Sequence, residues 1–268
     1  MITELKYANT NTYLIKGKNG YILFDTDWAG TFLSFCKAIK KAGVEAREIQ
    51  YLFLSHFHPD HMGIAQEIAD LGITIVVLDV QREFIHSSDA IFEKDKKKRF
   101  RPIDDEKIQM LSLEDSRAFL EKVGIAGEII YTPGHSDDSI SLWLDEGILF
   151  VGDLNPLYEL ELHKGTRIGE SWETLLSRKP TRIYYGHAKT AILDEFMKEK
   201  ENGTVSDKKL YVLVQTIMRC ADRGLPIDKI QKKTGADRIF IEDVTRMYLT
   251  HQNVGVQGIL DRIEIKNK

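Results

Sequence analysis

Cysteine is almost absent from the sequence: Cys36 and Cys220 are the only two among 268 residues. Two isolated cysteines give no sign of a disulfide framework, and we expect both to be small buried hydrophobic residues. Long apolar runs are also missing, since none approaches the roughly 18 residues of a membrane span. The first residues, Met1-Ile2-Thr3-Glu4, lack the basic and apolar regions of a signal peptide. We therefore expect a cytoplasmic protein without a membrane segment.

The chain also has no large excess of charge. A net charge of −4 and 43% hydrophobic residues fit one large globular domain followed by a small one, and they favour no particular class of partner. Residues 204–268 carry 12 Lys and Arg against 8 Asp and Glu, or +4, and the residues before them carry 25 against 33, or −8. A nucleic-acid-binding face would need a stronger concentration of basic residues.

Histidines are concentrated in residues 55–61, which read Ser-His-Phe-His-Pro-Asp-His. This stretch follows the apolar run 51–54, which is typical of a buried strand, so it is expected on a loop at the end of that strand. Imidazole nitrogens and carboxylate oxygens are ligands for zinc, manganese and iron. The stretch therefore predicts a metal site, although a polar loop with solvated histidines is an alternative. The first two histidines can converge on one ion, and the aspartate and last histidine can face another.

A histidine-rich motif of the form H-x-H-x-D-H after an apolar strand resembles the signature of the metallo-β-lactamase-fold hydrolases. Three further parts of that signature follow in order, each just beyond an apolar strand-like run: His135 after Thr-Pro-Gly, Asp153 after Phe-Val-Gly and His187 after Tyr-Tyr-Gly. The resemblance covers about residues 1 to 200. It implies an α/β fold, the αββα four-layer sandwich, with a catalytic domain over residues 1–203.

The resemblance also implies two divalent cations, with Zn²⁺ as the expected metal and iron or manganese as alternatives. The seven implied ligands are His56, His58, Asp60, His61, His135, Asp153 and His187. One ion would take the histidines 56, 58 and 135, the other would take residues 60, 61 and 187, and Asp153 would bridge both. Two cations lower the pKa of a shared water from 15.7 toward about 7, and the bridging hydroxide would attack a carbonyl of the substrate.

Two residues are candidates for catalysis beyond metal binding. Asp60 is expected to orient the hydroxide and to carry a proton to the leaving group. Tyr158, on the loop after Asp153, is a candidate to donate a hydrogen bond to an oxyanion or leaving group, as a tyrosine does in some lactone-cleaving relatives. A packed aromatic residue is the alternative interpretation of Tyr158. His163 in the same region is expected at the surface, and His86 is left out of the site.

An aspartate at position 153, where many true β-lactamases carry cysteine, points to the glyoxalase II and lactonase branches of the resembled family. The implied substrate is a small thioester, ester or lactone. One alternative function is a mononuclear iron oxygenase of the persulfide dioxygenase type, which would use only His56, His135 and Asp153. Another is a regulator whose metal site senses a ligand and whose C-terminal helices bind DNA.

Periodicity predicts alternating strands and helices through the first 200 residues. Antiparallel hairpins are predicted at 12–25 and 140–151, helices at 31–42 and 171–178, and a helix and strand at 64–78. The acidic turn Asp25-Thr26-Asp27 either resembles a turn that the family carries near its site or caps the next helix. Residues 81–106 form a charged insert, either a solvated helix face or a flap over the site that handles an anionic substrate.

A change of pattern near residue 204 predicts a separate C-terminal domain over residues 204–268. Its helices are expected at 210–221, 227–234 and 239–249, with glycine-containing breaks between them. Three short helices with tight turns favour a helix-turn-helix or winged-helix arrangement. We expect this module to pack on the catalytic domain or to make a homodimer, with nucleic-acid binding as the less favoured role.

Overall fold

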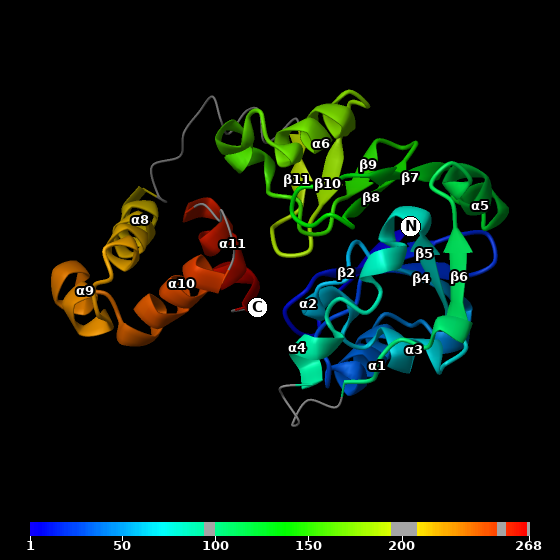
Figure 1. Cartoon of the computed structure of the whole chain (residues 1–268), viewed down its shortest axis with the longest axis horizontal. Helices are drawn as coiled ribbons and strands as arrows, with labels where there is room; N and C mark the ends of the chain where they lie inside the picture. The colour runs from blue at the N-terminus through cyan, green and yellow to red at the C-terminus, as the bar shows by residue number, and fades with distance from the viewer. Residues whose placement is uncertain (94–99, 194–207, 251–255, 267–268) are drawn as a thin grey trace.

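Two β-sheets lie face to face in the computed structural model, with helices on both outer sides (Figure 1). The structure describes residues 1–93, 100–193, 208–250 and 256–266. The strands of the first sheet are, in spatial order, β1 (Ile2–Leu5), β2 (Thr12–Lys16), β3 (Tyr21–Phe24), β4 (Ile49–Phe53), β5 (Thr74–Leu78) and β6 (Ile108–Leu111). β1, β2 and β3 pair antiparallel, whereas β3 to β6 pair parallel.

The second sheet is built from the other half of the domain. Its strands are, in spatial order, β11 (Ala191–Ile192), β10 (Arg182–Tyr184), β9 (Ile148–Phe150), β8 (Ile140–Leu144) and β7 (Gly127–Tyr131). β9 and β10 run parallel, and the remaining neighbours are antiparallel. The carboxyl ends of β7, β9 and β10 therefore meet at one edge of the sheet.

Side chains along each strand face alternately toward the other sheet and toward the outer helices, and this alternation produces the layers. In β3, Phe24 faces the second sheet in a cluster with Phe53 and Phe150, whereas its neighbour Leu23 faces the outer helices. The helices outside the first sheet are α1 (Phe32–Lys41), α2 (Pro59–Met62), α3 (Ala65–Ala69) and α4 (Asp89–Glu93). On the second sheet, α6 (Arg167–Leu176) buries Trp172, and α5 (Ser116–Lys122) contacts β7. Strands buried on both faces need such cover, and the expected four-layer αββα sandwich is confirmed.

Local signals account for most element boundaries. The hairpin β2–β3 and the hairpin β8–β9 lie where the alternation predicts them. Helix α1 ends as expected at Gly43, whose φ of +73° is the left-handed conformation that glycine adopts readily, and Val44 N–H donates to Ile39 C=O across that end. Strands β1 and β11 were not predicted, because residues 2–5 do not alternate between apolar and polar side chains and β11 has only two residues. Helix α6 begins four residues before the predicted start of 171.

The charged insert is only partly a helix. It contains the 3₁₀ turns Asp79–Phe84 and Asp105–Lys107 and the short helix α4, while the basic run at 94–99 lies outside the described residues. His86 pairs with Asp89 and Asp105 at the surface of this insert, which agrees with its exclusion from the site.

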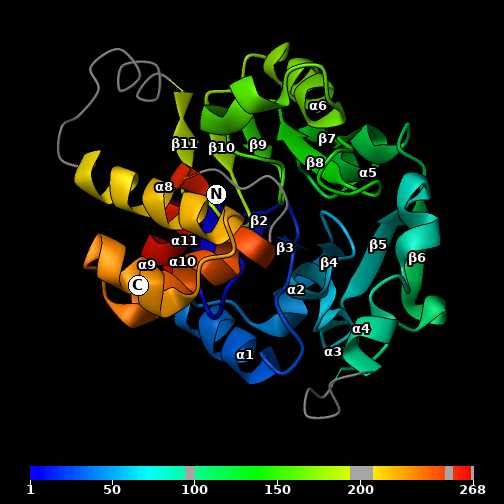
Figure 2. The same cartoon turned by 60° about the vertical axis from the view of Figure 1, so that its left-hand side comes forward.

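The C-terminal helices form a bundle with its own hydrophobic cluster (Figures 1 and 2). They are α8 (Lys208–Asp222), α9 (Ile227–Thr234), α10 (Arg238–Thr250) and α11 (Val256–Lys266). The first three confirm the predicted helices, and α11 was missed. No strand occurs in the described residues 208–250 and 256–266, so these parts contain no wing. None of the described helices has the length and apolar character needed to cross a membrane.

Candidate metal centre

The loop after β4 carries four of the predicted ligands and is fixed by side chains from other elements. Ser55 N–H donates to Asp25 Oδ1 at 2.6 Å, and Phe57 N–H donates to Asp138 Oδ2 at 2.6 Å. Ser88 Oγ donates to the Phe57 carbonyl at 2.6 Å. Pro59 then starts helix α2 in the position where a missing N–H has no cost. The histidines of this loop are therefore held in place before any ion binds.

The other three predicted ligands follow β7, β9 and β10, whose carboxyl ends share one edge of the second sheet. Ile140 N–H donates to the Ser55 carbonyl at 2.8 Å and so joins this edge to the loop after β4. Gly134, with φ +144°, precedes His135 and leaves no room for a Cβ, which would lie 2.7 Å from Ile168 N. Close packing against α6 thus directs the His135 loop toward the first sheet.

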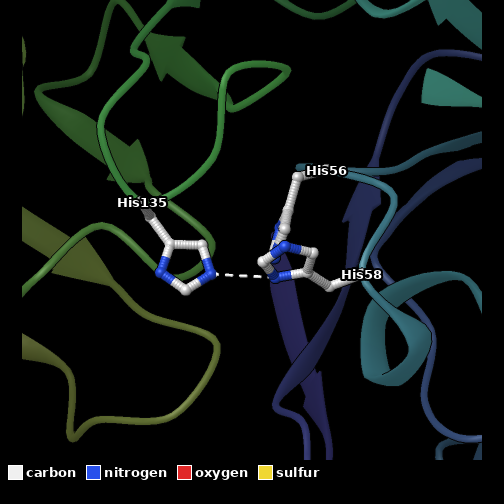
Figure 3. A group of neighbouring side chains, drawn as sticks. All are labelled: His56, His58 and His135. Carbon is white, nitrogen blue, oxygen red and sulfur yellow. Dashed lines mark hydrogen bonds between the residues drawn. The ribbon is translucent and has the colours of Figure 1, made fainter. Parts of the chain in front are cut away.

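All seven predicted residues come together, in two groups. In each group, one ligand atom per residue lies within 4.8 Å of the others. The first group is His56, His58 and His135, and the second is Asp60, His61, Asp153 and His187. Figure 3 shows His135, on the loop after β7, facing His56 and His58 on the loop after β4, with His135 Nε2 3.1 Å from His58 Nδ1.

Asp153 contacts both groups with different oxygens. Its Oδ1 lies 3.2 Å from His61 Nε2 and 3.5 Å from His187 Nε2, in the second group. Its Oδ2 lies 3.6 Å from His135 Nε2, in the first group. This is the placement that a carboxylate bridging two ions requires.

Ring nitrogens that face away from the centre have hydrogen-bond partners. His56 Nδ1 lies 2.9 Å from Ser55 Oγ, His61 Nδ1 lies 3.0 Å from Asp25 Oδ2, and His187 Nδ1 lies 3.1 Å from the Asn9 carbonyl. Such partners fix the ring orientation and the tautomer of metal-binding histidines. The arrangement leaves Nε2 of all three rings directed at the centre.

Several buried atoms at the centre make no hydrogen bond within the part of the chain that the structure describes. They are His56 Nε2, His61 Nε2 and Asp153 Oδ1, the last two in contact but not aligned as a hydrogen bond. A buried polar atom without a partner costs free energy, and a cation in each ligand group would satisfy all three. The residues present therefore fit divalent metal ions.

The two ligand groups differ in the charge of their side chains. Burial lowers the pKa of His56 well below its usual value, and the neighbouring imidazoles add to the effect; burial also lowers the pKa of His135 to about 4. Burial acts against the charged form of His61 as well, but Asp153 and Asp25 outweigh it and raise the His61 pKa. His56 and His135 are thus neutral imidazoles, the form that binds metal, whereas the carboxylates of the second group attract positive charge.

Asp60 and Asp153 keep their negative charge although they are buried. Burial alone would raise the pKa of both carboxyl groups, but the hydrogen bond from His187 to Asp60 and the charge of His187 beside Asp153 hold both values below the usual range. Two carboxylates at the centre would offset part of the charge of two divalent cations.

Of the two interpretations of the acidic turn 25–27, the position near the site is the correct one. Asp25 Oδ2 lies 3.0 Å from His61 Nδ1, and Asp27 accepts N–H bonds from Asn9 and Thr10 at 2.8 Å. The helix-cap alternative is wrong, because α1 begins after Thr31.

The sequence predictions for two residues of the 3₁₀ turn Leu157–His163 have different outcomes. His163 is 4% exposed, so the expected surface position is wrong; the turn folds back on the first residues of α6, where Thr166 donates to the His163 carbonyl. Tyr158 lies in the same turn, but its side chain falls outside the described residues, and its catalytic role stays a prediction.

Comparison with known proteins agrees with this geometry. A family model described as the metallo-beta-lactamase superfamily matches residues 6–187. A Beta-lactamase-like protein 2 homolog from Caenorhabditis elegans is 27% identical over 252 residues, covering 91% of this chain and 70% of the relative. The Drosophila melanogaster homolog is 28% identical over 192 residues, covering 69% of this chain and 60% of the relative, so the chain spans less than two thirds of that protein.

A solved structure, that of TTHA1623 in a di-iron-bound form, has the same fold. It superposes with a TM-score of 0.52 at 19% sequence identity, covering 72% of this chain and 95% of the other. The family model, the two facing sheets and the two groups of histidine and aspartate side chains lead to one conclusion: this chain belongs to the metallo-beta-lactamase superfamily.

Proposed function

We propose that this chain is a dinuclear metal-dependent hydrolase that cleaves a small thioester, ester or lactone. The observation that carries the proposal is the position of Asp153, which faces one group of ligands with each oxygen. A mononuclear site made of His56, His135 and Asp153 would leave the other members of the second group, residues 60, 61 and 187, without a role. We expect Zn²⁺ at both positions, with iron as the alternative that the di-iron neighbour makes worth testing.

Bound cations would lower the pKa of a water at the centre toward about 7, which supplies hydroxide at neutral pH. The chain itself positions the reactants on the accessible side of the centre. There the side chains of Asp60 and His135 are 18% and 24% exposed, whereas His56 and His61 are fully buried. The substrate carbonyl is therefore expected to approach from the side of Asp60 and His135.

Asp60 is the residue we expect to move a proton. Its backbone carbonyl accepts a hydrogen bond from Thr10 Oγ1 at 2.7 Å, and its Oδ2 lies 2.9 Å from His187 Nε2. The carboxylate is thus fixed at the open side of the centre, within reach of a leaving group. General acid–base catalysis needs this combination of proximity and a charged carboxylate.

The substrate class rests on the aspartate at position 153 and on the family resemblance. Thioesters, esters and lactones share an electrophilic carbonyl and a leaving oxygen or sulfur, so one centre can serve all three. No separate serine or cysteine nucleophile is required, and both cysteines, Cys36 and Cys220, lie outside the two ligand groups.

The first test is a metal analysis combined with a substrate panel. Protein purified without added metal is expected to contain two ions per chain and, after reloading, to hydrolyse a member of a panel of thioesters, lactones, phosphodiesters and β-lactams. Removal of the ions with a chelator is expected to abolish turnover, and zinc should restore it. One iron per chain with sulfite production from a persulfide would instead support a dioxygenase.

Asp60→Ala tests whether Asp60 transfers a proton in addition to binding an ion. We expect turnover to fall at least about tenfold and by a larger factor than the metal content, because the remaining second-group ligands still hold an ion. His58→Ala, the comparison variant, is expected to lose metal from the first group. Equal turnover in Asp60→Ala and the unsubstituted chain would exclude Asp60 from proton transfer.

We also propose that residues 204–268 form a separate small domain. The hydrophobic cluster of α8 to α11 contains only residues from these helices and the turns between them, and all seven candidate ligands precede it. A chain ending at residue 203 is therefore expected to bind the same number of ions, measured by metal analysis. Loss of metal on truncation would show that the helices support the centre.

Nucleic-acid binding by the C-terminal helices is not part of the proposal. In α10, the helix in the recognition position, Arg238 pairs with Asp228 and Glu242, and Arg246 pairs with Asp243. Acidic neighbours on the same surface weaken attraction to phosphate. A small-molecule substrate is the partner we propose, and a homodimer through these helices stays a prediction.

A further inference from the structure

Ser55 lies between the two groups of candidate ligands, and we propose that its hydroxyl is a positioning group shared by both metal sites. The inference rests on the proposed dinuclear centre. It assigns a role to a residue that neither contacts an ion nor takes part in the reaction.

The Ser55 hydroxyl oxygen contacts one imidazole from each group. It lies 2.9 Å from Nδ1 of His56, in the first group, and 3.4 Å from Nδ1 of His61, in the second. Ser55 is 1% exposed, so solvent does not compete for these contacts. A single buried oxygen atom thus links the two sites on the side away from the substrate.

The position of this oxygen is determined by the surrounding elements. Ser55 N–H donates to Oδ1 of Asp25, while the other oxygen of Asp25 holds His61 Nδ1 at 3.0 Å. The Ser55 carbonyl accepts a hydrogen bond from Ile140 N–H on the second sheet. The serine is therefore fixed on both sides of its Cα, and its hydroxyl has little freedom to move away.

Gly152 makes the space for this hydroxyl. A Cβ at position 152 would lie 2.3 Å from Ser55 Oγ, and the φ of +52° at this residue also favours glycine. Gly152 directly precedes Asp153, so the backbone that delivers the bridging carboxylate passes close to the serine. The loop after β9 is shaped around Ser55 as well as around the metal ligands.

Proton positions explain why the hydroxyl matters. A histidine that binds metal through Nε2 must carry its proton on Nδ1. For His61, the nearer acceptor of that proton is the Asp25 carboxylate at 3.0 Å, and Ser55 Oγ at 3.4 Å is a second, more distant acceptor. For His56, the acceptor is Ser55 Oγ, which selects the tautomer with Nε2 free to bind. The same oxygen then limits the tilt of both rings, so its removal affects both ions.

The test is a zinc titration against a competing chelator, which resolves two binding steps. Ser55→Ala is expected to weaken both steps by about tenfold or more, the usual effect of removing a hydrogen-bond partner of a metal ligand. Ser116→Ala is the matched control, because its hydroxyl is equally buried and accepts a hydrogen bond from Ile129 N–H at 3.1 Å, but it contacts neither ligand group nor the loop after β4. This control is expected to change either step by less than about twofold.

The outcomes separate this inference from the proposed function. Weakening of one step alone, or an equal effect of Ser116→Ala, would overturn the shared role of Ser55 and leave the dinuclear centre intact. Fewer than two ions in the unsubstituted chain would overturn the centre and this inference with it. Should Ser55→Ala not fold, nitrogen NMR of histidine-labelled, unsubstituted protein freed of metal decides: His56 protonated on Nδ1 before any ion binds supports the inference, and protonation on Nε2 contradicts it.

Discussion

Asp153→Asn is expected to lower hydrolysis by about 10³-fold or more and to reduce tightly bound metal from two ions to at most one. The substitution keeps the shape of the side chain but removes the negative charge between the two ligand groups, 3.2 Å from His61 Nε2 and 3.6 Å from His135 Nε2. Two cations without a bridging anion repel each other, and a loss of about 4 kcal/mol of transition-state stabilisation corresponds to this factor.

Asp138→Asn is the matched control for that experiment. It makes the same chemical change at a buried carboxyl group that accepts the Phe57 N–H bond and belongs to neither ligand group. Because Asp138 helps to hold the loop after β4, we expect some loss of metal affinity and turnover, but a much smaller loss than in Asp153→Asn, with two ions still bound at saturating metal. Metal analysis and kcat/KM on the substrate found in the panel give both readouts. Two ions and full activity in Asp153→Asn would show that the centre is not bridged by this residue.

Gly186→Ala is expected to have the second-largest effect, about a 10²-fold loss of activity with weaker metal binding. A Cβ at this position would lie 2.7 Å from Asp153 Oδ1 and 2.8 Å from His61 Cε1. The backbone cannot move aside freely, because Gly186 N–H donates to the Gly152 carbonyl and its own carbonyl accepts from Asn11 N–H. The two ligands must shift instead, and displacements near 1 Å cost about this factor.

Gly43→Ala distinguishes crowding of the centre from loss of stability. This glycine has φ +73°, and a methyl group on its Cα would have open space around it, with no contact within 4 Å among the described residues beyond its own chain neighbours. Alanine there is expected to cost about 1 kcal/mol through backbone strain while the metal content stays at two. A lower melting temperature with full metal in Gly43→Ala, beside lost metal in Gly186→Ala, is the expected pair of results.

Much of the fold could be predicted because its signals are local. The hairpin β2–β3 shows alternation and a turn sequence, and helix α1 has a regular apolar face and a terminal glycine. Two of the missed elements lack such signals: β1 does not alternate between apolar and polar residues, and β11 has only two residues, so both depend on pairing with a neighbouring strand. Helix α11 could have been predicted, because Val256, Ile259, Leu260 and Ile263 recur at helical spacing and pack in the cluster of the C-terminal helices.

The residues of the candidate metal centre could likewise be predicted only in part. Chemistry that is unusual in a short stretch, such as three histidines within residues 56–61, can be found from the sequence. Ser55, Asn9 and Gly186 could not, since a serine, a backbone carbonyl and a glycine carry no pattern of their own and matter only through distances of about 3 Å. His163 was wrongly predicted at the surface, because a single polar residue gives no indication of burial.

The division of the ligands between the two sheets has a consequence for how the protein matures. Four ligands come from the loop after β4, which the ribosome delivers early, whereas the last, His187, follows β10. The two proposed ions do not both have their complete sets of partners until Asp153 and His187 have emerged and the second sheet has docked on the first. Metal capture is therefore a late event of biosynthesis, and a nascent chain that ends before His187 can acquire at most a partly liganded pair of ions.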